Sequence, residues 1–301
     1  MPELPEVQTT ASILNREIKG LKILDVWTDY DSPFNKGKNN IKDKKYFSLF
    51  KKAVLNKKIL GVERRAKNVL INVSGNKTIL VHMKMTGHLL YGKYKFQNKK
   101  WFPVDDGPLA DPFNRFIHLA FSLSDKNTLV LSDTRKFAKV FVFDTDKAKE
   151  TADLKKLGPE PLDSGFTYKI FKERISKKPN GKIKTVLMDQ EIIAGIGNIY
   201  SDEVLYLAGI HPVTRVKDIS EAKLKVLYTN IIRVLKQSIK IGGDSMSDYR
   251  NPLGEKGGYQ KIHKVYRKTG KKCVMKGCKG IIRRMKVGGR SAHFCDCHQT
   301  K

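Results

Sequence analysis

Acidic residues are scarce in this chain of 301 residues. There are 30 Asp and Glu against 59 Lys and Arg, which leaves a formal net charge of +29. A surplus this large exceeds what solubility requires and predicts a polyanionic partner. The surplus is also uneven, since residues 261–301 hold thirteen basic residues and one acidic residue, whereas residues 1–35 hold six acidic and three basic residues. This unevenness argues against a lysine-rich composition spread over solvated faces.

Long apolar runs are missing as well. No stretch approaches the roughly 18 apolar residues of a membrane-spanning helix, and basic amphipathic helices are fewer than lysine-rich strands. We therefore expect nucleic acid, and no membrane, as the partner. The amino terminus has Glu and Pro where a secretory signal needs positive charge and an apolar stretch, which predicts a protein of the reducing cytoplasm.

Cysteine is rare, and all four cysteines fall within the last thirty residues. In a reducing compartment such a cluster predicts metal ligands before disulfides. The ligand candidates form two groups, namely Cys273 with Cys278 and then Cys295, Cys297 and His298. Two pairs of ligands are typical of a structural zinc site, and a region this small and basic could hardly fold without a metal. The fourth ligand stays open between Cys297 and His298.

Basic residues lie between the two ligand groups, on an expected hairpin. They are Arg283, Arg284, Lys286 and Arg290. Basic hairpins held by zinc normally contact phosphates or a groove of DNA.

The first half of the chain has the pattern of a β structure. Between residues 23 and 143, short β-rich runs alternate with turn residues, which predicts an antiparallel sandwich or barrel. One amphipathic helix is expected before it, at residues 7–19, with Gly20 ending it. The lysine-rich stretches 36–58 and 93–101 are expected to be exposed loops or sheet edges.

The second half has helical periodicity. Residues 157–162 contain two prolines and a glycine and mark the boundary, and a helix capped by Ser220 is expected to end at Gly242. The turn at residues 195–198, with two glycines and an asparagine, could hold a phosphate at a helix N-terminus. A plain glycine-rich turn between packed helices explains it equally well.

The first six residues carry the most specific chemistry. A small residue such as Pro2 permits removal of Met1, which exposes a secondary amine whose pKa of about 7.7–8.0 leaves a useful neutral fraction. That amine can condense with an aldehyde-level carbon to give an iminium ion, with Glu3 beside it as a general acid or base. Taken alone, these residues are more often a capping turn before a helix, so the chemistry needs support from elsewhere in the chain.

That support comes from a resemblance along the whole chain to the formamidopyrimidine-DNA glycosylase family. The segments that carry it are Pro2-Glu3-Leu4-Pro5-Glu6-Val7, Arg64-Arg65-Ala66-Lys67, His82-Met83-Lys84-Met85-Thr86-Gly87, Asp133-Thr134-Arg135-Lys136-Phe137, residues 157–162, residues 195–212 and the terminal cysteine cluster. They stand in the family's order, so chance similarity is excluded as an explanation.

The resemblance implies an α+β multidomain fold. An antiparallel β-sandwich with an N-terminal helix (residues 2–150) would be followed by a helix–two-turn–helix domain (151–260) and a zinc-finger β-hairpin (261–301). It also implies a monomer that binds double-stranded DNA containing oxidised bases in the cleft between these parts, in the cytoplasm at the nucleoid. One structural zinc ion is the expected cofactor.

The resemblance also implies the catalytic roles. Pro2 would form a Schiff base at the deoxyribose C1′, and Glu3 would assist opening of the sugar ring. Lys67 would transfer a proton during β-elimination. Arg290 would serve δ-elimination and bind the phosphates that flank the lesion.

Further residues would hold the DNA. Met85, Arg135 and Phe137 resemble the residues that fill the space left by the extruded nucleotide, and Lys184 and Asn198 match the residues that clamp the backbone. Arg64 and Arg65 are interpreted as a solvated charge run that helps hold the DNA. The chain departs from the family pattern at three places. Ala138 stands where the family has glycine, and His118 lies in a stretch where a DNA-contacting histidine of the family cannot be aligned with this chain. The chain also has a Cys-x-Cys-His ending in place of the usual Cys-x2-Cys.

The expected reaction is excision of 8-oxoguanine and formamidopyrimidines, followed by strand cleavage through β,δ-elimination. Residues 242–249 resemble the lesion-binding loop of the oxidised-purine enzymes rather than that of the endonuclease VIII branch, which prefers oxidised pyrimidines. A non-catalytic DNA-binding relative would lack Pro2, Glu3 or Lys67, and all three are present. An RNA-binding zinc-ribbon protein would explain the charge and the cysteines but not the amino terminus.

Overall fold

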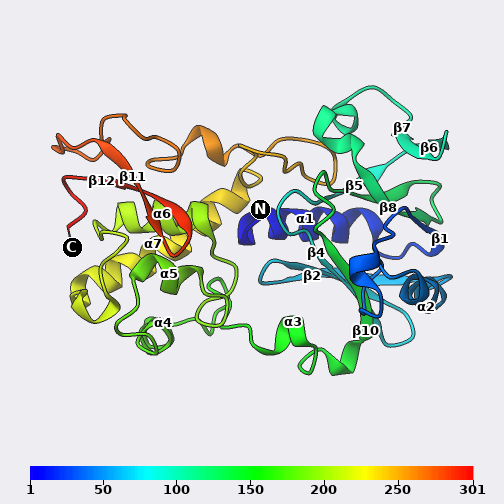
Figure 1. Cartoon of the computed structure of the whole chain (residues 1–301), viewed down its shortest axis with the longest axis horizontal. Helices are drawn as coiled ribbons and strands as arrows, with labels where there is room; N and C mark the ends of the chain where they lie inside the picture. Colours follow the sequence, from blue (N-terminus) through cyan, green and yellow to red (C-terminus); the bar gives the residue numbers. More distant parts are fainter. Residues whose placement is uncertain (301) are drawn as a thin grey trace. The chain divides into compact units, whose positions relative to one another are not determined.

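The computed structural model describes residues 1–300, and the chain divides into two compact units (Figure 1). Unit 1 comprises Met1–Lys155 and Ile241–Gly258, and unit 2 comprises Lys156–Lys240 and the chain from Tyr259 onward. Residues 241–258 thus belong with the first half of the chain although they follow the helices of the second. The division into three parts at residues 150 and 260 stays a prediction.

Unit 1 contains two four-stranded antiparallel sheets. The first has the order β1 (Ile23–Thr28), β8 (Ile117–Leu123), β9 (Thr128–Ser132), β5 (His88–Gly92). The second has the order β10 (Lys139–Asp144), β4 (Lys77–His82), β3 (Asn68–Val73), β2 (Ile59–Arg65). Buried side chains from both sheets and from helix α1 (Leu4–Ile18) form one core, which confirms the predicted sandwich with its N-terminal helix.

Helix α2 (Lys44–Val54) corrects one expectation, because this part of the stretch 36–58 is not a loop. Phe50 and Val54 are fully buried one turn apart, and the Asp43 carboxylate caps the helix by accepting the Tyr46 N–H at 2.6 Å. The lysines of this stretch make the apolar periodicity hard to detect in the sequence, because the long basic side chains on the outer face of the helix keep its mean hydropathy low. The stretch 93–101 lies at the surface as expected, in a hairpin of β6 (Tyr94–Gln97) and β7 (Lys100–Pro103). A short helix, α3 (Ala152–Lys155), ends this part of unit 1.

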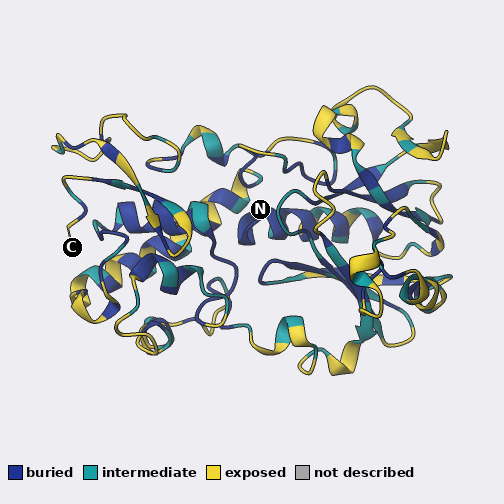
Figure 2. Ribbon diagram, viewed as in Figure 1, coloured by how far each residue is buried: buried dark blue, intermediate teal, exposed yellow. Residues whose placement is uncertain are grey.

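Unit 2 is helical and ends in a hairpin. Its elements are α4 (Tyr168–Ile175), α5 (Ile183–Met188), α6 (Asn198–Leu207), α7 (Glu221–Lys240), β11 (Ile282–Val287) and β12 (Arg290–Cys295). Helix α6 is buried over most of its length (Figure 2), including the polar residues Ser201, Asp202 and Glu203. Buried polar groups must have partners, so these residues indicate where unit 2 is held together.

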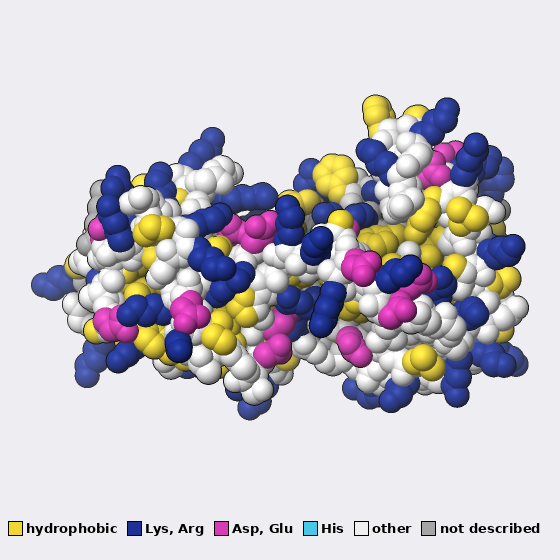
Figure 3. Space-filling view, turned by 90° about the horizontal axis from the view of Figure 1, so that it is seen from below, with side chains coloured by type: hydrophobic (Ala, Val, Ile, Leu, Met, Phe, Trp, Pro, Cys, Tyr) yellow, Lys and Arg dark blue, Asp and Glu magenta, His cyan; other side chains and the backbone are white. Residues whose placement is uncertain are grey.

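The surface is mainly basic. Figure 3 shows Lys and Arg side chains spread over one face of the molecule, with fewer Asp and Glu among them. Among the described residues, no helix has the combination of length and apolar character that crossing a membrane requires.

Candidate active site and metal centre

The amino terminus lies at the start of α1, and Met1 itself is 39% exposed. Pro2 and Glu3 are both buried, and Glu3 is the residue that precedes the helix. Pro5 suits the first turn, where a missing N–H costs nothing. The Glu6 carboxylate turns back and accepts the Glu3 N–H at 2.7 Å, so it fixes the backbone directly beside Pro2.

Glu6 also ties the amino terminus to the segment 241–258. Its second carboxylate oxygen accepts the Asp244 N–H at 2.8 Å, and the Tyr249 hydroxyl donates to the Glu6 carbonyl at 2.9 Å. Gly243 has φ +80°, and a Cβ there would lie 2.9 Å from the Glu6 carboxylate. The close approach therefore requires glycine at this position. The loop that resembles the lesion-binding loop is thus packed on the first turn of α1.

Lys67 approaches this terminus from a tight turn. β2 and β3 pair at Arg65 and Asn68, which leaves Ala66 and Lys67 as a two-residue turn with Ala66 at φ +53°. Arg64 supports that turn by donating to the Ala66 carbonyl at 3.1 Å. The half-buried Arg64 thus braces this turn, and its part in holding DNA stays a prediction.

Charge and burial act together on the amine at the terminus. Burial lowers the pKa of the Met1 amino group below its usual 8.0, and the Lys67 charge acts in the same direction. Glu3, Glu6 and Asp248 oppose this by raising the pKa. One lysine and three carboxylates thus surround the position where the predicted nucleophile stands.

The Asp133 carboxylate holds together two turns in another part of unit 1. Its buried carboxylate accepts hydrogen bonds from the Ala138 N–H at 2.7 Å, from the Arg135 N–H at 3.3 Å and from the Thr86 hydroxyl. These bonds join the turn that carries Met85 to the turn that carries Arg135 and Phe137. Burial and the neighbouring Asp133 carboxylate raise the pKa of Tyr30, whose hydroxyl donates to the same group.

The three predicted void-filling residues therefore lie on turns held by one carboxylate. Phe137 is 51% exposed, and the Arg135 guanidinium lies 4.6 Å from the centre of its ring. Met85 is half-buried. Ala138 is fully buried and donates to Asp133, so alanine fits in the position where the family has glycine. His118 binds Asp29 at 2.8 Å and packs on Tyr30, with ring centres 5.2 Å apart.

In unit 2 the side chain of Gln190 holds the glycine-rich turn at residues 195–198. Gln190 accepts the Gly195 N–H and donates to the Ile196 carbonyl, at 2.9 and 2.8 Å. Asn198 begins α6, and its side-chain Oδ1 is buried with no hydrogen-bond partner among the described residues. This oxygen is a hydrogen-bond acceptor and cannot itself bind a phosphate, so the phosphate-binding role of the turn stays a prediction beside a plain packing turn.

Lys184 corrects another expectation. Its ammonium is fully buried and binds Asp202 at 2.5 Å and the Ser201 hydroxyl at 3.1 Å, so from this position it cannot contact a phosphate. Asp202 also accepts both the backbone N–H and the ring nitrogen of His293, each at 2.9 Å. Asp202 thus joins α5 and the first turn of α6 to β12 of the hairpin.

Removing this carboxylate should destabilise unit 2 strongly. Asp202→Ala leaves the Lys184 ammonium buried without a counter-charge, so we expect a loss of about 3–5 kcal/mol in the free energy of unfolding. Lys184→Met in the same chain should recover much of that loss, because no buried charge then remains. Urea unfolding of the wild type, both single variants and the double variant measures the coupling. Additive effects of the two substitutions would contradict the pairing.

Arg290 is presented at the tip of the hairpin. Gly288 and Gly289 form the turn with φ +55° and +74°, and Arg290 is exposed as the first residue of β12. A Cβ on Gly288 would lie 2.4 Å from the Thr185 methyl group, so the tip packs closely on α5. The hairpin and its basic side chains are placed as the sequence predicts.

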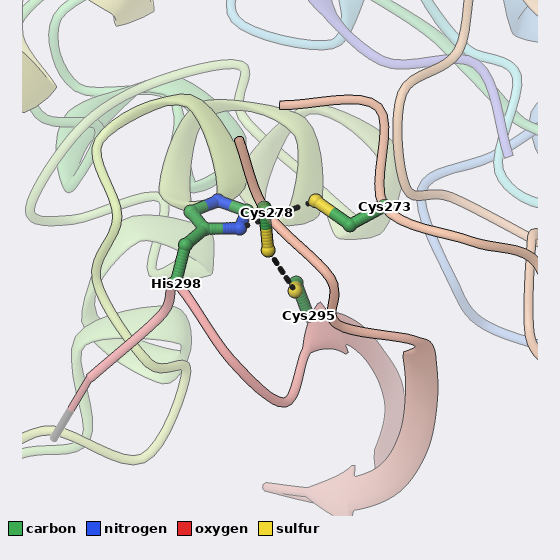
Figure 4. A group of neighbouring side chains, drawn as sticks. All are labelled: Cys273, Cys278, Cys295 and His298. Atoms are coloured by element: carbon green, nitrogen blue, oxygen red, sulfur yellow. Dashed lines mark hydrogen bonds between the residues drawn. The ribbon is translucent and has the colours of Figure 1, made fainter. Parts of the chain in front are cut away.

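The cysteine cluster forms a site that could hold a metal ion. Cys273, Cys278, Cys295 and His298 each offer one ligand atom, and these atoms all lie within 4.8 Å of one another (Figure 4). The Cys273 sulfur is 3.3 Å from His298 Nδ1, and the Cys278 and Cys295 sulfurs are 3.6 Å apart. Three thiols and one imidazole are a donor set suited to tetrahedral binding.

The structure resolves the choice between Cys297 and His298. His298 Nε2 bonds to the Tyr206 carbonyl at 2.9 Å, which directs Nδ1 toward the sulfurs. Cys297 is exposed and outside the cluster. Cys278 accepts the Gly280 N–H at 3.3 Å, and a Cβ on Gly280 would lie 2.5 Å from the Cys295 sulfur. This knuckle therefore needs glycine.

Three supporting residues escaped the sequence analysis as site residues, namely Glu6, Asp133 and Asp202. The first two lie inside the recognised segments, and a carboxylate close to a turn could have indicated a backbone acceptor. Asp202 gives no such signal, because its partners are distant in sequence. Within unit 1 the structure brings Glu3, Lys67 and the amino terminus together, and within unit 2 it joins the Asn198 turn to the Arg290 hairpin through Asp202.

Comparison with known proteins gives a consistent match. Residues 1–140 match the formamidopyrimidine-DNA glycosylase N-terminal domain, and residues 157–250 match the formamidopyrimidine-DNA glycosylase H2TH domain. The formamidopyrimidine-DNA glycosylase of Lactococcus lactis subsp. lactis (strain IL1403) is 35% identical over 301 residues, and that of Bacillus subtilis (strain 168) is 33% identical over 302 residues. Each alignment covers 100% of both chains.

Solved structures agree with this. A complex of Lactococcus lactis Fpg with DNA containing an abasic site has a TM-score of 0.82 at 33% identity, covering 99% of this chain and 100% of that chain. A complex of the wild-type Lactococcus lactis protein with DNA containing N7-benzyl-Fapy-dG has a TM-score of 0.80 at 33% identity, covering 98% of each chain.

Proposed function

The chain belongs to the formamidopyrimidine-DNA glycosylase family and is a DNA glycosylase that acts on damaged DNA, and we propose that it is bifunctional. It excises 8-oxoguanine and formamidopyrimidines from duplex DNA through a Pro2 Schiff base and then cuts the strand by β,δ-elimination. The observation that carries this proposal is the buried Pro2 beside a terminal amine whose pKa responds to Lys67 and to the carboxylates of Glu3, Glu6 and Asp248.

The first step is attack of the neutral Pro2 nitrogen on the deoxyribose C1′, which breaks the glycosidic bond and releases the base. Opening of the sugar ring breaks the bond between C1′ and O4′, and Glu3 supplies the proton that O4′ receives. The Pro2 N–H proton leaves with the departing base, and the product is an iminium ion between Pro2 and C1′. Burial lowers the pKa of the Met1 amine in this chain, and the same effect on a Pro2 amine would increase its neutral fraction at cellular pH.

The later steps use the electron-accepting iminium. Removal of a proton from C2′ expels the 3′ phosphate, and Lys67 serves this proton transfer. Removal of a proton from C4′ then expels the 5′ phosphate, with the exposed Arg290 binding the phosphates around the lesion. Both eliminations leave a gap in the strand that is bounded by phosphates, and hydrolysis of the imine returns the Pro2 amine.

The nucleotide must leave the base stack before Pro2 can reach C1′. Extrusion costs a few kcal/mol, which Met85, Arg135 and Phe137 would partly offset by filling the vacated space. Asn198 and the N-terminus of α6 would hold a backbone phosphate. Lys184 supports that turn from inside unit 2 rather than binding DNA directly.

Zinc is the metal that we propose for Cys273, Cys278, Cys295 and His298. When bound, it supplies no chemistry to the reaction and stabilises the fold of the basic hairpin. We further propose that the protein acts on duplex DNA as a monomer.

Borohydride trapping tests the proposed nucleophile. Untagged protein, shown by mass spectrometry to lack Met1, should form a covalent adduct with duplex DNA containing 8-oxoguanine. Digestion should locate the adduct at Pro2. If no adduct forms while damaged duplex is still bound, the chain is a binding protein and the catalytic proposal is wrong.

Lesion preference tests the assignment to the oxidised-purine branch. Single-turnover excision of 8-oxoguanine opposite cytosine should be faster than excision of thymine glycol from a matched duplex. The physical reason is that the loop at residues 242–249, which is held on Glu6 by the Asp244 N–H and the Tyr249 hydroxyl, would shape the base pocket. Faster release of the pyrimidine lesion would reverse the assignment.

A further inference from the structure

The β6–β7 hairpin projects from unit 1 on a turn with unusual backbone geometry. Gln97 pairs with Lys100, so Asn98 and Lys99 form a two-residue turn with φ +52° and +61°. Such turns favour glycine at the second position. A lysine at the tip therefore carries conformational strain that glycine would avoid, and strain of this kind often accompanies a functional position.

One face of the hairpin is packed on the sandwich. Phe96 and Trp101 are paired across the strands with ring centres 5.2 Å apart, and both contact Trp27 of β1, at 5.4 and 6.2 Å. An isolated two-stranded hairpin would be only marginally stable. This aromatic cluster fixes its orientation, so the opposite face is held out to solvent.

The opposite face combines an aromatic ring with lysines. Lys95 is paired with Phe102, and Gln97 is paired with Lys100, which places these four side chains together. Phe102 is 42% exposed, and Lys93, Lys95, Lys99 and Lys100 are all exposed. Residues 93–104 contain no acidic residue, and none of the four lysines forms a salt bridge with any described residue.

We propose that this hairpin face is a second nucleic-acid contact that binds an unpaired DNA strand. Lysines along an exposed strand would follow the phosphates, and Phe102 would stack on a base. A single strand fits better than a duplex, because only unpaired bases offer their faces to an aromatic ring. In Figure 1 the hairpin lies well away from the amino terminus of the same unit, so this contact is separate from the proposed reaction site.

Two variants test the two parts of the surface. K95Q/K99Q/K100Q removes charge, and Phe102→Ala removes the ring, while the Phe96–Trp101–Trp27 cluster is kept in both. The matched control, K44Q/K45Q/K52Q, removes three exposed lysines from α2 of the same unit. Circular dichroism and thermal melting should show that all three fold as the wild type does.

Fluorescence anisotropy across a salt series is the readout, with labelled oligo-dT and an undamaged duplex as probes. The lysine variant should lower the slope of log affinity against log salt for oligo-dT by about 2, since each lost phosphate contact removes roughly 0.7. Phe102→Ala should weaken oligo-dT binding about tenfold with the slope unchanged, because stacking is not ionic. Duplex binding should change much less.

Two results would overturn the proposal. If the lysine variant and the α2 control lower the slope equally, general charge explains binding and the hairpin has no special part. If Phe102→Ala has no effect on oligo-dT, the ring does not stack and the surface fits an acidic protein better. Single-turnover excision at saturating enzyme should be unchanged in both variants, so a failure here is distinct from a failure of the Pro2 chemistry.

Discussion

Protein that keeps Met1, or that carries any added residue before Pro2, is expected to form no borohydride-trapped adduct with lesion DNA. An added residue turns the Pro2 nitrogen into an amide, which is not nucleophilic and cannot form an iminium ion. The DNA contacts lie on other residues, so affinity for the lesion duplex should stay largely intact. Trapping and anisotropy on the same preparations separate the two effects.

Pro2→Gly provides the matched control for this prediction. Glycine also permits removal of Met1 and offers a free α-amine, so a slower but detectable adduct should form. An absence of adduct with the extended protein, beside some adduct with the Pro2→Gly variant, would show that a free amine on residue 2 is the essential feature. Full trapping by the extended protein would remove Pro2 from the mechanism.

The pH dependence of trapping follows from the burial and the charges around the terminal amine. The neutral amine is the reactive form. In the chain that keeps Met1, burial and the Lys67 charge lower the pKa of the terminal amine, and we expect the same two effects on the Pro2 amine once Met1 is removed. The rising limb of the trapping rate should therefore lie at a lower pH than the titration of an N-terminal proline in a short peptide. Lys67→Met removes one of the lowering effects, so the limb should move to higher pH. An unchanged limb in Lys67→Met would contradict the proposed effect of the Lys67 charge.

The positions of Pro2, Glu3 and Lys67 follow from local sequence patterns, while their catalytic roles stay a prediction. Pro2 and Glu3 directly precede α1, and Lys67 lies in a two-residue turn whose strands are evident from their β-branched residues. Their approach to one another follows once α1 and the two sheets share a core. The residues that escaped prediction act through packing, and packing has no local pattern.

Lys184 shows this limit most clearly. The family resemblance implies that Lys184 contacts the DNA backbone, yet its ammonium is fully buried against Asp202. The pairing depends on how α5 and α6 pack, and the segment between them gives no indication of it. Helix α2 escaped prediction for a related reason, since exposed lysines obscure the buried positions Phe50 and Val54.

The fourth metal ligand is a further case in which spacing alone was insufficient. Cys297 and His298 are adjacent, and the choice between them depends on the Tyr206 carbonyl, which comes from α6 and accepts from His298 Nε2. A contact between elements more than ninety positions apart in the chain thus decides which side chain turns inward. The sequence limits the choice to two residues, and the packing selects one.

Substitutions of Cys297 and of His298 should therefore have sharply different effects. His298→Ala removes a ligand, so we expect loss of bound zinc, unfolding of the hairpin and a large loss of affinity for lesion duplex, since metal binding contributes directly to folding. Cys297→Ser changes an exposed side chain outside the cluster and should keep one zinc ion per chain and normal trapping. Elemental analysis gives the metal content, and circular dichroism with anisotropy gives the fold and the binding.

Cys273→Ser is the positive control, because its sulfur lies 3.3 Å from His298 Nδ1 within the same cluster. It should resemble His298→Ala in metal content and in DNA affinity. Loss of zinc from Cys297→Ser combined with retention by His298→Ala would instead mean that the chain binds metal through four sulfurs. The Tyr206 carbonyl would then orient an imidazole that binds no metal, and the basic hairpin with Arg290 would depend on a different set of ligands.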